Sequence, residues 1–383
     1  GSEMCIRDSL RRTYTLGLKR EALSPPPRVF ETALAGTAQI VQTVENDILG
    51  QYFLPGIEIE TCRDADECCK KIRDILKDAN RRYKLALAAQ QRAVAEHVYA
   101  VRVTPILNWI REHGNTPKKS EPKRNLLICV HNYVEQRPFG GVEILTERLV
   151  RYLKHEWNVY LLYPSNTDAK WYLQDSKTAI RSETPLKVIS RYETLSAASP
   201  YEALEFKKIL LQKEISLVYF QHLLNYPLLL PLSASELGIP FILSFHDYYP
   251  ICHKFNLVDL FNAYCHPHRI PLESCDVCLQ RSLGAQIRRR ELIAKVLKKA
   301  CGIHCVSSWQ KTLIASIYPE FEQRLQVIEP GCEEGTPPET LGWNRKLRVV
   351  VPGNIGFHKG AAVLSEVTCL LYTSPSPRDR TRS

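Results

Sequence analysis

The stretch Asn125–His131, with the sequence NLLICVH, decides the fold. Its apolar run from Leu126 to Val130 is typical of a strand that is buried on both faces of a parallel sheet. A loop with two glycines follows, and a helical pattern then extends from Gly141 to about Glu156. A strand, a loop and a helix in this order form the repeating unit of parallel α/β sheets.

The same alternation continues toward the carboxyl terminus. We expect further strands at Val159–Tyr163, Lys187–Ser190, Leu217–Gln221, Phe241–Phe245, Gly302–Val306 and Leu325–Ile328. Helical patterns cover Pro200–Lys213 and Gln286–Lys299, and Ser307 with Gln310 forms a capping box that opens another helix. The pattern therefore predicts one nearly complete, doubly wound, Rossmann-like parallel sheet domain over residues 124–331.

A partial α/β domain is expected before it, over residues 10–112. Thr37–Val44 and Ile57–Cys62 have the composition of short strands. Asp64 with Glu67 predicts a capped helix behind the second strand, and another helix is expected over Ala79–Glu96. Residues 113–123 are polar and contain two prolines, so we interpret them as a linker.

The ends of the chain predict a third part and two non-native stretches. Lys346–Val351 resembles the first strand of a new Rossmann-like domain, which we place at residues 346–368. Residues 1–9 and the Ser/Pro/Arg-rich residues 369–383 are interpreted as non-native sequence and set aside. We therefore expect a fragment of a longer protein, which has little turnover by itself.

Composition narrows the function classes. The 383 residues carry a net charge of +10, which favours anionic partners. Without a secretory signal, the thirteen cysteines are expected to be reduced thiols and the protein to be cytoplasmic. The apolar segment Leu223–Phe245 is interrupted by prolines, Glu236 and a Gly-Ile-Pro break, so it predicts a helix, a turn and a strand instead of a membrane span.

The first candidate site is the turn that contains Gly140, Gly141 and Glu143. Two glycines between a strand and a helix permit positive φ and a close approach of the backbone. The amides of the first helical turn, at the positive end of the helix dipole, suit a phosphate. A simple tight turn is the alternative.

Two further turns carry reactive side chains. His246 and Asp247 follow an apolar strand, where open α/β sheets bind ligands, and they could supply an acid, a base or hydroxyl contacts. A structural hydrogen bond of His246 is the alternative. Lys359 and Gly360 end the motif GNIGFHKG, where the lysine would neutralise a diphosphate. A solvated lysine in a glycine-rich turn is the alternative.

Four cysteines form a candidate metal site. Cys252, Cys265, Cys275 and Cys278 could close a tetrahedral structural zinc site, with the nearby His253, His266 and His268 as alternative ligands. Free or paired thiols in an ordered loop are the competing interpretation. We expect no cofactor to be required for catalysis.

A basic amphipathic helix is predicted at residues 286–299. Its arginines and lysines alternate with apolar residues, which is compatible with a peripheral contact with anionic lipid at the inner face of a membrane. A solvated outer helix of the sheet is the alternative. We do not expect nucleic-acid binding, because neither interleaved surface aromatics nor a finger spacing is present.

From Asn125 to about Val367 the chain resembles glycosyltransferase family 4 enzymes of the GT-B fold. The resemblance implies that residues 124–331 are the amino-terminal, acceptor-side domain of such an enzyme and that residues 346–368 begin its donor-binding domain. The residues that carry the resemblance are Gly140–Glu143, His246–Pro250 and His358–Gly360, in this order and spacing. The resemblance implies sugar transfer from a nucleotide diphosphate sugar, usually with retention of configuration. Gly140, Gly141 and Glu143 would lie by the donor diphosphate, His246 and Asp247 near the transferred sugar, and Lys359 and Gly360 at the leaving diphosphate.

The first segment resembles the donor domain of glycosyltransferases related to spore maturation protein CgeB. The stretch Ser24–Ala33, SPPPRVFETA, carries this resemblance. It implies that Arg28 and Glu31 bind the donor, with Glu31 gripping the ribose. Family 4 often has a paired glutamate eight positions earlier, where this chain has Leu23.

Together these features predict a hexosyltransferase that passes a sugar to a glycan or lipid-linked acceptor in polysaccharide biosynthesis. The competing hypothesis is a degenerate, non-catalytic binding or scaffold module of a glycan-assembly complex, which Leu23 favours for the first segment. Retained donor binding without transfer would distinguish the second hypothesis from the first.

Overall fold

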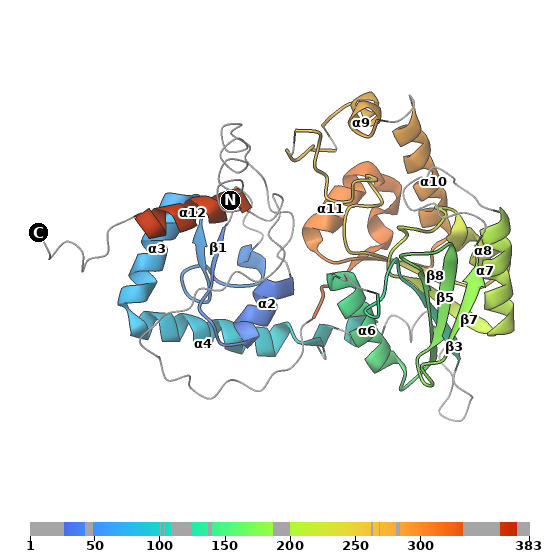
Figure 1. Cartoon of the computed structure of the whole chain (residues 1–383), viewed down its shortest axis with the longest axis horizontal. Coiled ribbons are helices and arrows are strands. Elements are labelled where there is room, and N and C mark those ends of the chain that lie inside the picture. Colours follow the sequence, from blue (N-terminus) through green and yellow to red (C-terminus); the bar gives the residue numbers. More distant parts are fainter. Residues whose placement is uncertain are drawn as a thin grey trace, which may run out of the picture. The chain divides into compact units, whose positions relative to one another are not determined.

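The computed structural model shows two compact units (Figure 1). The first unit comprises residues 1–102, 258–265 and 331–383, and the second comprises 103–257 and 266–330. The residues that the structure describes are 27–42, 49–99, 101–102, 104–106, 108, 124–136, 140–186, 200–261, 263–267, 269–280, 284–331 and 361–373. The predicted strands 187–190 and 346–351, the linker 113–123, the terminal residues 1–9, and the site residues His268, Lys359 and Gly360 lie outside them.

The second unit is built on an eight-stranded sheet with the order β10-β9-β8-β7-β3-β4-β5-β6. All pairs from β10 to β4 are parallel, and the last two pairs are antiparallel. The strands are β3 (Asn125–Cys129), β4 (Asn158–Pro164), β5 (Lys170–Asp175), β6 (Arg181–Pro185), β7 (Ile215–Phe220), β8 (Phe241–Phe245), β9 (Gly302–Cys305) and β10 (Leu325–Val327). The predicted Rossmann-like α/β fold is confirmed.

Helices cover this sheet as the alternation predicts. They are α6 (Gly141–Leu153), α7 (Pro200–Gln212), α8 (Leu230–Glu236), α9 (Leu272–Cys278), α10 (Ala285–Lys299) and α11 (Ser308–Ile317), with a 3-10 turn η2 (Pro319–Arg324) before β10. Ser307 accepts a hydrogen bond from the Gln310 amide at 3.1 Å, so the predicted cap of α11 is confirmed. The segment Leu223–Phe245 folds into α8, a turn and β8, as expected. No helix in the described part of the chain is long and apolar enough to cross a bilayer.

The core of the second unit lies on both faces of the parallel strands. Leu126, Leu127, Ile128 and Cys129 of β3 are fully buried, as a continuous apolar run requires. Large rings complete the packing, including Trp171, which lies edge-on to Phe206 with ring centroids 6.4 Å apart. A core of this kind fixes the strand ends, where the candidate site residues are found.

The first unit contains a two-stranded parallel sheet of β1 (Ile40–Gln42) and β2 (Glu60–Cys62). Its helices are α2 (Pro27–Leu34), α3 (Ala65–Lys77), α4 (Ala79–Glu96) and α12 (Ala361–Thr373), and a 3-10 turn η1 covers Leu49–Gln51. The Asp64 carboxylate caps α3 through the Glu67 amide at 2.8 Å, as predicted. Helix α12 packs on α3 through Val367, which lies against Ala65 and Cys69 (Figure 1).

Gly331, in the first unit, allows an unusually close approach between two backbones. A Cβ atom at this position would lie 2.5 Å from the Tyr99 Cα and 2.8 Å from the Tyr99 nitrogen. Because backbone atoms cannot move aside as a flexible side chain can, we expect Gly331→Ala to lower the free energy of unfolding by about 2 kcal/mol. Gly56→Ala is the matched control, because nothing lies within 4 Å of its Cβ position.

The control separates crowding from backbone strain. Gly56 has a positive φ of 79°, so alanine there is expected to lose about 1 kcal/mol through its backbone conformation alone. Urea unfolding of the two variants measures the difference. Equal destabilisation of the two would show that the Tyr99 backbone does not restrict residue 331.

Candidate functional site

Three neighbouring parallel strands end next to a histidine. His246 comes directly after β8. One residue lies between the end of β7 and His222, and one residue lies between the end of β3 and His131. Since the order of these strands is β8-β7-β3, the three imidazoles lie along one carboxyl edge of the sheet. The rings of His131 and His222 are 4.5 Å apart between centroids. His246 was predicted as a site residue, whereas His131 and His222 were not.

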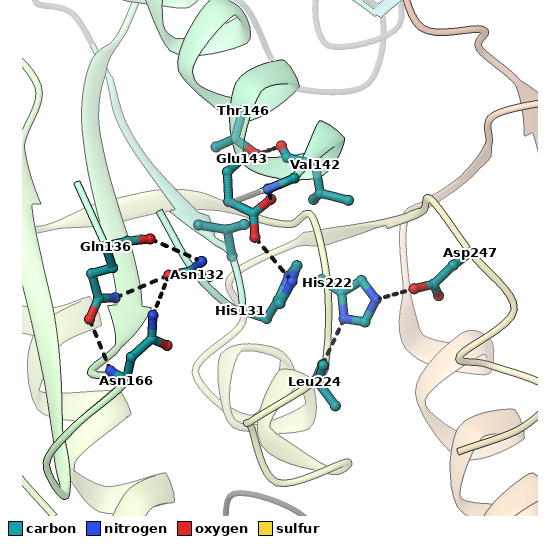
Figure 2. A network of polar contacts seen from close by, with 12 residues as sticks. His131, Asn132, Gln136, Val142, Glu143, Thr146, Asn166, His222, Leu224 and Asp247 are labelled. Atoms are coloured by element: carbon teal, nitrogen blue, oxygen red, sulfur yellow. Dashed lines mark hydrogen bonds and ion pairs between the residues drawn. The ribbon is translucent and has the colours of Figure 1, made fainter. Parts of the chain in front are cut away.

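His222 is held by two hydrogen bonds (Figure 2). Its Nδ1 accepts from the Leu224 amide at 2.9 Å, so this nitrogen carries a lone pair. The proton therefore lies on Nε2, which is 2.9 Å from Asp247 Oδ2. Because both ring nitrogens are engaged, His222 orients Asp247 and does not itself offer a base to a substrate.

Asp247 is held as a carboxylate. Burial opposes its ionisation, but His222 and the Tyr249 amide, which donates to Oδ1 at 2.9 Å, together lower its pKa. Its side chain keeps 27% of its surface exposed, while the His222 side chain keeps 4%. The site thus presents a partly accessible negative charge. The role of Asp247 as an acid, a base or a contact to hydroxyls stays a prediction.

Glu143 joins the glycine turn to His131 (Figure 2). Its Oε2 accepts the Gly140 amide at 2.8 Å, and its Oε1 lies 3.1 Å from His131 Nε2. Burial and the neighbouring His222 lower the pKa of His131 to about 3, so the neutral ring donates its single N–H to Glu143. His131 Nδ1 is buried without a hydrogen-bond partner, which also disfavours a proton on it.

The glycine turn does not use positive φ at Gly140. Gly140 is the N-cap of α6 with φ −124° and ψ −159°, and Gly141 is the first residue of the helix. A Cβ at Gly140 would lie 3.4 Å from Glu143 Oε2, an ordinary van der Waals contact, so neither space nor a positive φ requires glycine there. The first-turn amides of α6 have no carbonyl one turn earlier to bind, which leaves them suited to an anion.

Amide side chains brace the loop that follows β3 (Figure 2). Gln136 donates to the Pro164 carbonyl at 2.9 Å and accepts from the Asn166 amide at 2.9 Å. Asn166 also donates to Asn132 Oδ1 at 3.1 Å. These contacts join the ends of β3 and β4 and therefore help to fix His131, which precedes Asn132.

The turn after β8 is held by side chains of α10 and α11. Arg289 donates to the Tyr249 and Pro250 carbonyls and lies 4.7 Å from the Tyr249 ring centroid. Gln310 donates to the Asp247 carbonyl at 2.8 Å. Gln286 and Tyr318 donate to the Ile251 and Pro250 carbonyls. Since the backbone after His246 is fixed by these bonds, His246 and Asp247 are rigidly placed.

The site residues predicted in the first unit lie on one helix. Arg28 and Glu31 are exposed, three positions apart on α2, so they are neighbours on its surface. Their role in donor binding stays a prediction. The same holds for Lys359 and Gly360, which the described residues do not include.

The zinc hypothesis gains no support from the described residues. Nowhere within them do three or more His, Cys, Asp or Glu side chains gather closely enough to hold a metal ion. Cys265 belongs to the first unit, whereas Cys252, Cys275 and Cys278 belong to the second. The zinc site therefore stays a prediction.

Helix α10 directs its apolar residues into the protein. Ile293, Val296 and Leu297 are buried, as is Arg289, whereas the exposed positions are mainly charged. The burial of these side chains within the second unit explains the amphipathic pattern, and only the exposed basic side chains are left to contact a lipid surface. The membrane contact through 286–299 stays a prediction.

Two protein-family profiles match the two segments of the chain. A family profile described as glycosyl transferase-like matches residues 9–108. A second profile, described as Glycosyltransferase Family 4, matches residues 139–334. The second match includes Gly140, Glu143, His222, His246 and Asp247. No curated protein matches the chain.

Proposed function

Because the chain belongs to Glycosyltransferase Family 4, we propose that its second unit uses the carboxyl edge of β3, β7 and β8 to bind a nucleotide diphosphate sugar and transfer its sugar. The observation that carries this proposal is the row of His131, His222 and His246, flanked by Glu143 and Asp247. The acceptor is proposed to be a glycan or a lipid-linked glycan of polysaccharide biosynthesis.

The chemistry of the site supports this assignment of roles. The first-turn amides of α6 are suited to bind the donor diphosphate, and they lie next to Gly140 and Gly141, the predicted donor contacts. Burial lowers the pKa of His246 to about 3, so its neutral ring can hydrogen-bond to sugar hydroxyls at pH 7. Asp247, ionised and partly exposed, can accept from hydroxyls or balance positive charge on the sugar.

A hexosyl donor is proposed, with Arg28, Glu31, Lys359 and Gly360 as further donor contacts. We also propose that the chain by itself transfers sugar slowly. Donor binding is therefore the more direct test than turnover.

Binding of nucleotide diphosphate hexoses to the whole chain tests the proposal. Saturation-transfer difference NMR and calorimetry against a panel of such donors are expected to find at least one ligand. His246→Ala is expected to weaken its binding by about tenfold, the effect of about one lost hydrogen bond to a neutral group. His155→Ala, an exposed histidine of the same unit, is the control and is expected to bind normally.

The outcomes separate the competing hypotheses. Donor binding that depends on His246, with nucleotide release in a coupled assay, supports a transferase. Binding without any transfer to a range of acceptors would favour the scaffold hypothesis. Equal binding by wild type, His246→Ala and His155→Ala would remove the proposed site from donor recognition.

A further inference from the structure

A buried glutamine lies directly against His246. Gln221 follows the last residue of β7, and only 1% of its surface is exposed. Its Oε1 is 2.8 Å from His246 Nε2. No feature of the sequence distinguished Gln221, because a polar residue at the end of a strand is ordinary.

This contact determines where His246 carries its proton. An amide oxygen accepts hydrogen bonds and cannot donate them, so His246 must donate from Nε2. The ring is neutral at pH 7 because burial lowers its pKa to about 3, and it therefore holds one proton only. Nδ1 is then left with a lone pair.

The structure places the Gln221 oxygen, and not its nitrogen, against His246 Nε2. The Gln221 nitrogen is buried and makes no hydrogen bond. An amide rotated by 180° would donate to His246 Nε2 and leave the ring proton on Nδ1, so the position of that proton reports the orientation of the amide.

We propose that Gln221 is a positioning residue for sugar transfer, which holds His246 as the Nε2–H tautomer so that Nδ1 accepts a hydrogen bond from a hydroxyl of the donor sugar. The inference rests on the proposed function of the site for its last step only. The tautomer itself is a property of the free protein.

The first experiment measures the tautomer without any ligand. Nitrogen-15 NMR of histidine-labelled protein distinguishes a protonated ring nitrogen from an unprotonated one. In the wild type we expect His246 to carry its proton on Nε2. In Gln221→Met, which keeps the length of the side chain but removes the acceptor, we expect a mixture of the two tautomers. A wild-type His246 protonated on Nδ1 would overturn the proposal.

The second experiment uses variants that separate positioning from folding. Gln221→Glu keeps an acceptor oxygen and is expected to keep the Nε2–H tautomer, while its negative charge raises the pH at which His246 titrates. Gln174→Met is the matched control: Gln174 is also buried, at 7% exposure, but its amide hydrogen-bonds to Tyr163 and Glu135, so the His246 tautomer should not change. An unchanged tautomer in Gln221→Met would also overturn the proposal.

The third readout connects the tautomer to function. Once a donor is found, Gln221→Met is expected to lower kcat by about tenfold or more, as loss of a partner that orients a functional histidine does elsewhere. Gln221→Glu is expected to keep most of the wild-type kcat, with its pH optimum shifted. If no donor binds any variant, the proposed function fails, whereas the NMR result on the tautomer stands independently.

Discussion

Between pH 7 and pH 5, the second unit is expected to lose about 6 kcal/mol of its free energy of unfolding. Burial lowers the pKa of His131 and His246 to about 3 and that of His304 to about 4. In the unfolded chain these histidines titrate near pH 6.5. Between the two values the unfolded state binds more protons than the folded state, so stability is complete above about pH 6.5 and falls as the pH falls.

The size of the effect follows from linkage. At pH 5 a histidine that is protonated only in the unfolded chain lowers stability by about 2 kcal/mol, and three give about 6 kcal/mol. The lowered pKa of Asp247 makes the free energy of unfolding depend on pH only below about pH 4, the ordinary pKa of an aspartate, so Asp247 does not oppose this trend.

Urea unfolding at pH 7, 6 and 5 measures this loss. Tryptophan fluorescence reports mainly on this unit, because it contains the buried Trp157 and Trp171. His304→Gln is expected to reduce the pH dependence by about a third, whatever its effect at pH 7. His155→Gln, at an exposed position, should leave the pH dependence unchanged. Constant stability from pH 7 to pH 5 would contradict burial of neutral histidines.

The parallel strands could be predicted because each is a continuous apolar run. β3 and β8 are buried along almost their whole length, and their boundaries differ from the predicted ones by two residues at most. β5 and β6 were missed for a physical reason. Lys170–Asp175 has polar residues at both ends, and Arg181–Pro185 is almost wholly exposed, so only pairing such as Tyr172 with Glu183 makes them strands. Such pairing is not visible in the pattern of one segment.

The site was predictable only in part. His246 and Asp247 follow a strong strand signal, and the sequence placed them correctly at its carboxyl end. His131 and His222 also follow buried strands, which was a usable signal, but the order β8-β7-β3 that brings them together comes from the fold. The place of Glu143 beside the donor stays a prediction, and its contacts with Gly140 and His131 could not be read from the sequence because they depend on the fold.

Arg289→Ala is expected to lower the free energy of unfolding of the second unit by about 3 kcal/mol. Arg289 is 2% exposed, and its guanidinium donates to the Tyr249 and Pro250 carbonyls. Pro250 keeps a second donor, the Tyr318 hydroxyl at 2.8 Å, so the Tyr249 carbonyl bears most of the loss. Loss of the cation above the Tyr249 ring adds about 1–2 kcal/mol, which relief from burying a charge partly offsets.

The change is also expected to reach the candidate site. The Tyr249 ring lies 5.2 Å from that of His222, and the Tyr249 amide donates to Asp247. When Arg289 no longer holds Tyr249, both contacts should loosen, and the NMR signals of the His222 ring should shift or broaden. Arg289→Lys is expected to lie between wild type and alanine, because an ammonium can bind one carbonyl but lacks the planar fork that reaches two.

Lys298→Ala is the matched control for Arg289→Ala, because it removes one positive charge from an exposed position of the same helix. It is expected to change stability by less than about 0.5 kcal/mol. If the two alanine variants unfold at the same urea concentration, α10 contributes only charge and the turn after β8 is fixed by other bonds. If only Arg289→Ala is destabilised and only it changes the His222 signals, the buried Arg289 holds the turn that places His246 and Asp247. The basic sequence pattern of α10 gives no reason to expect such a role, because it does not distinguish Arg289 from its exposed neighbours.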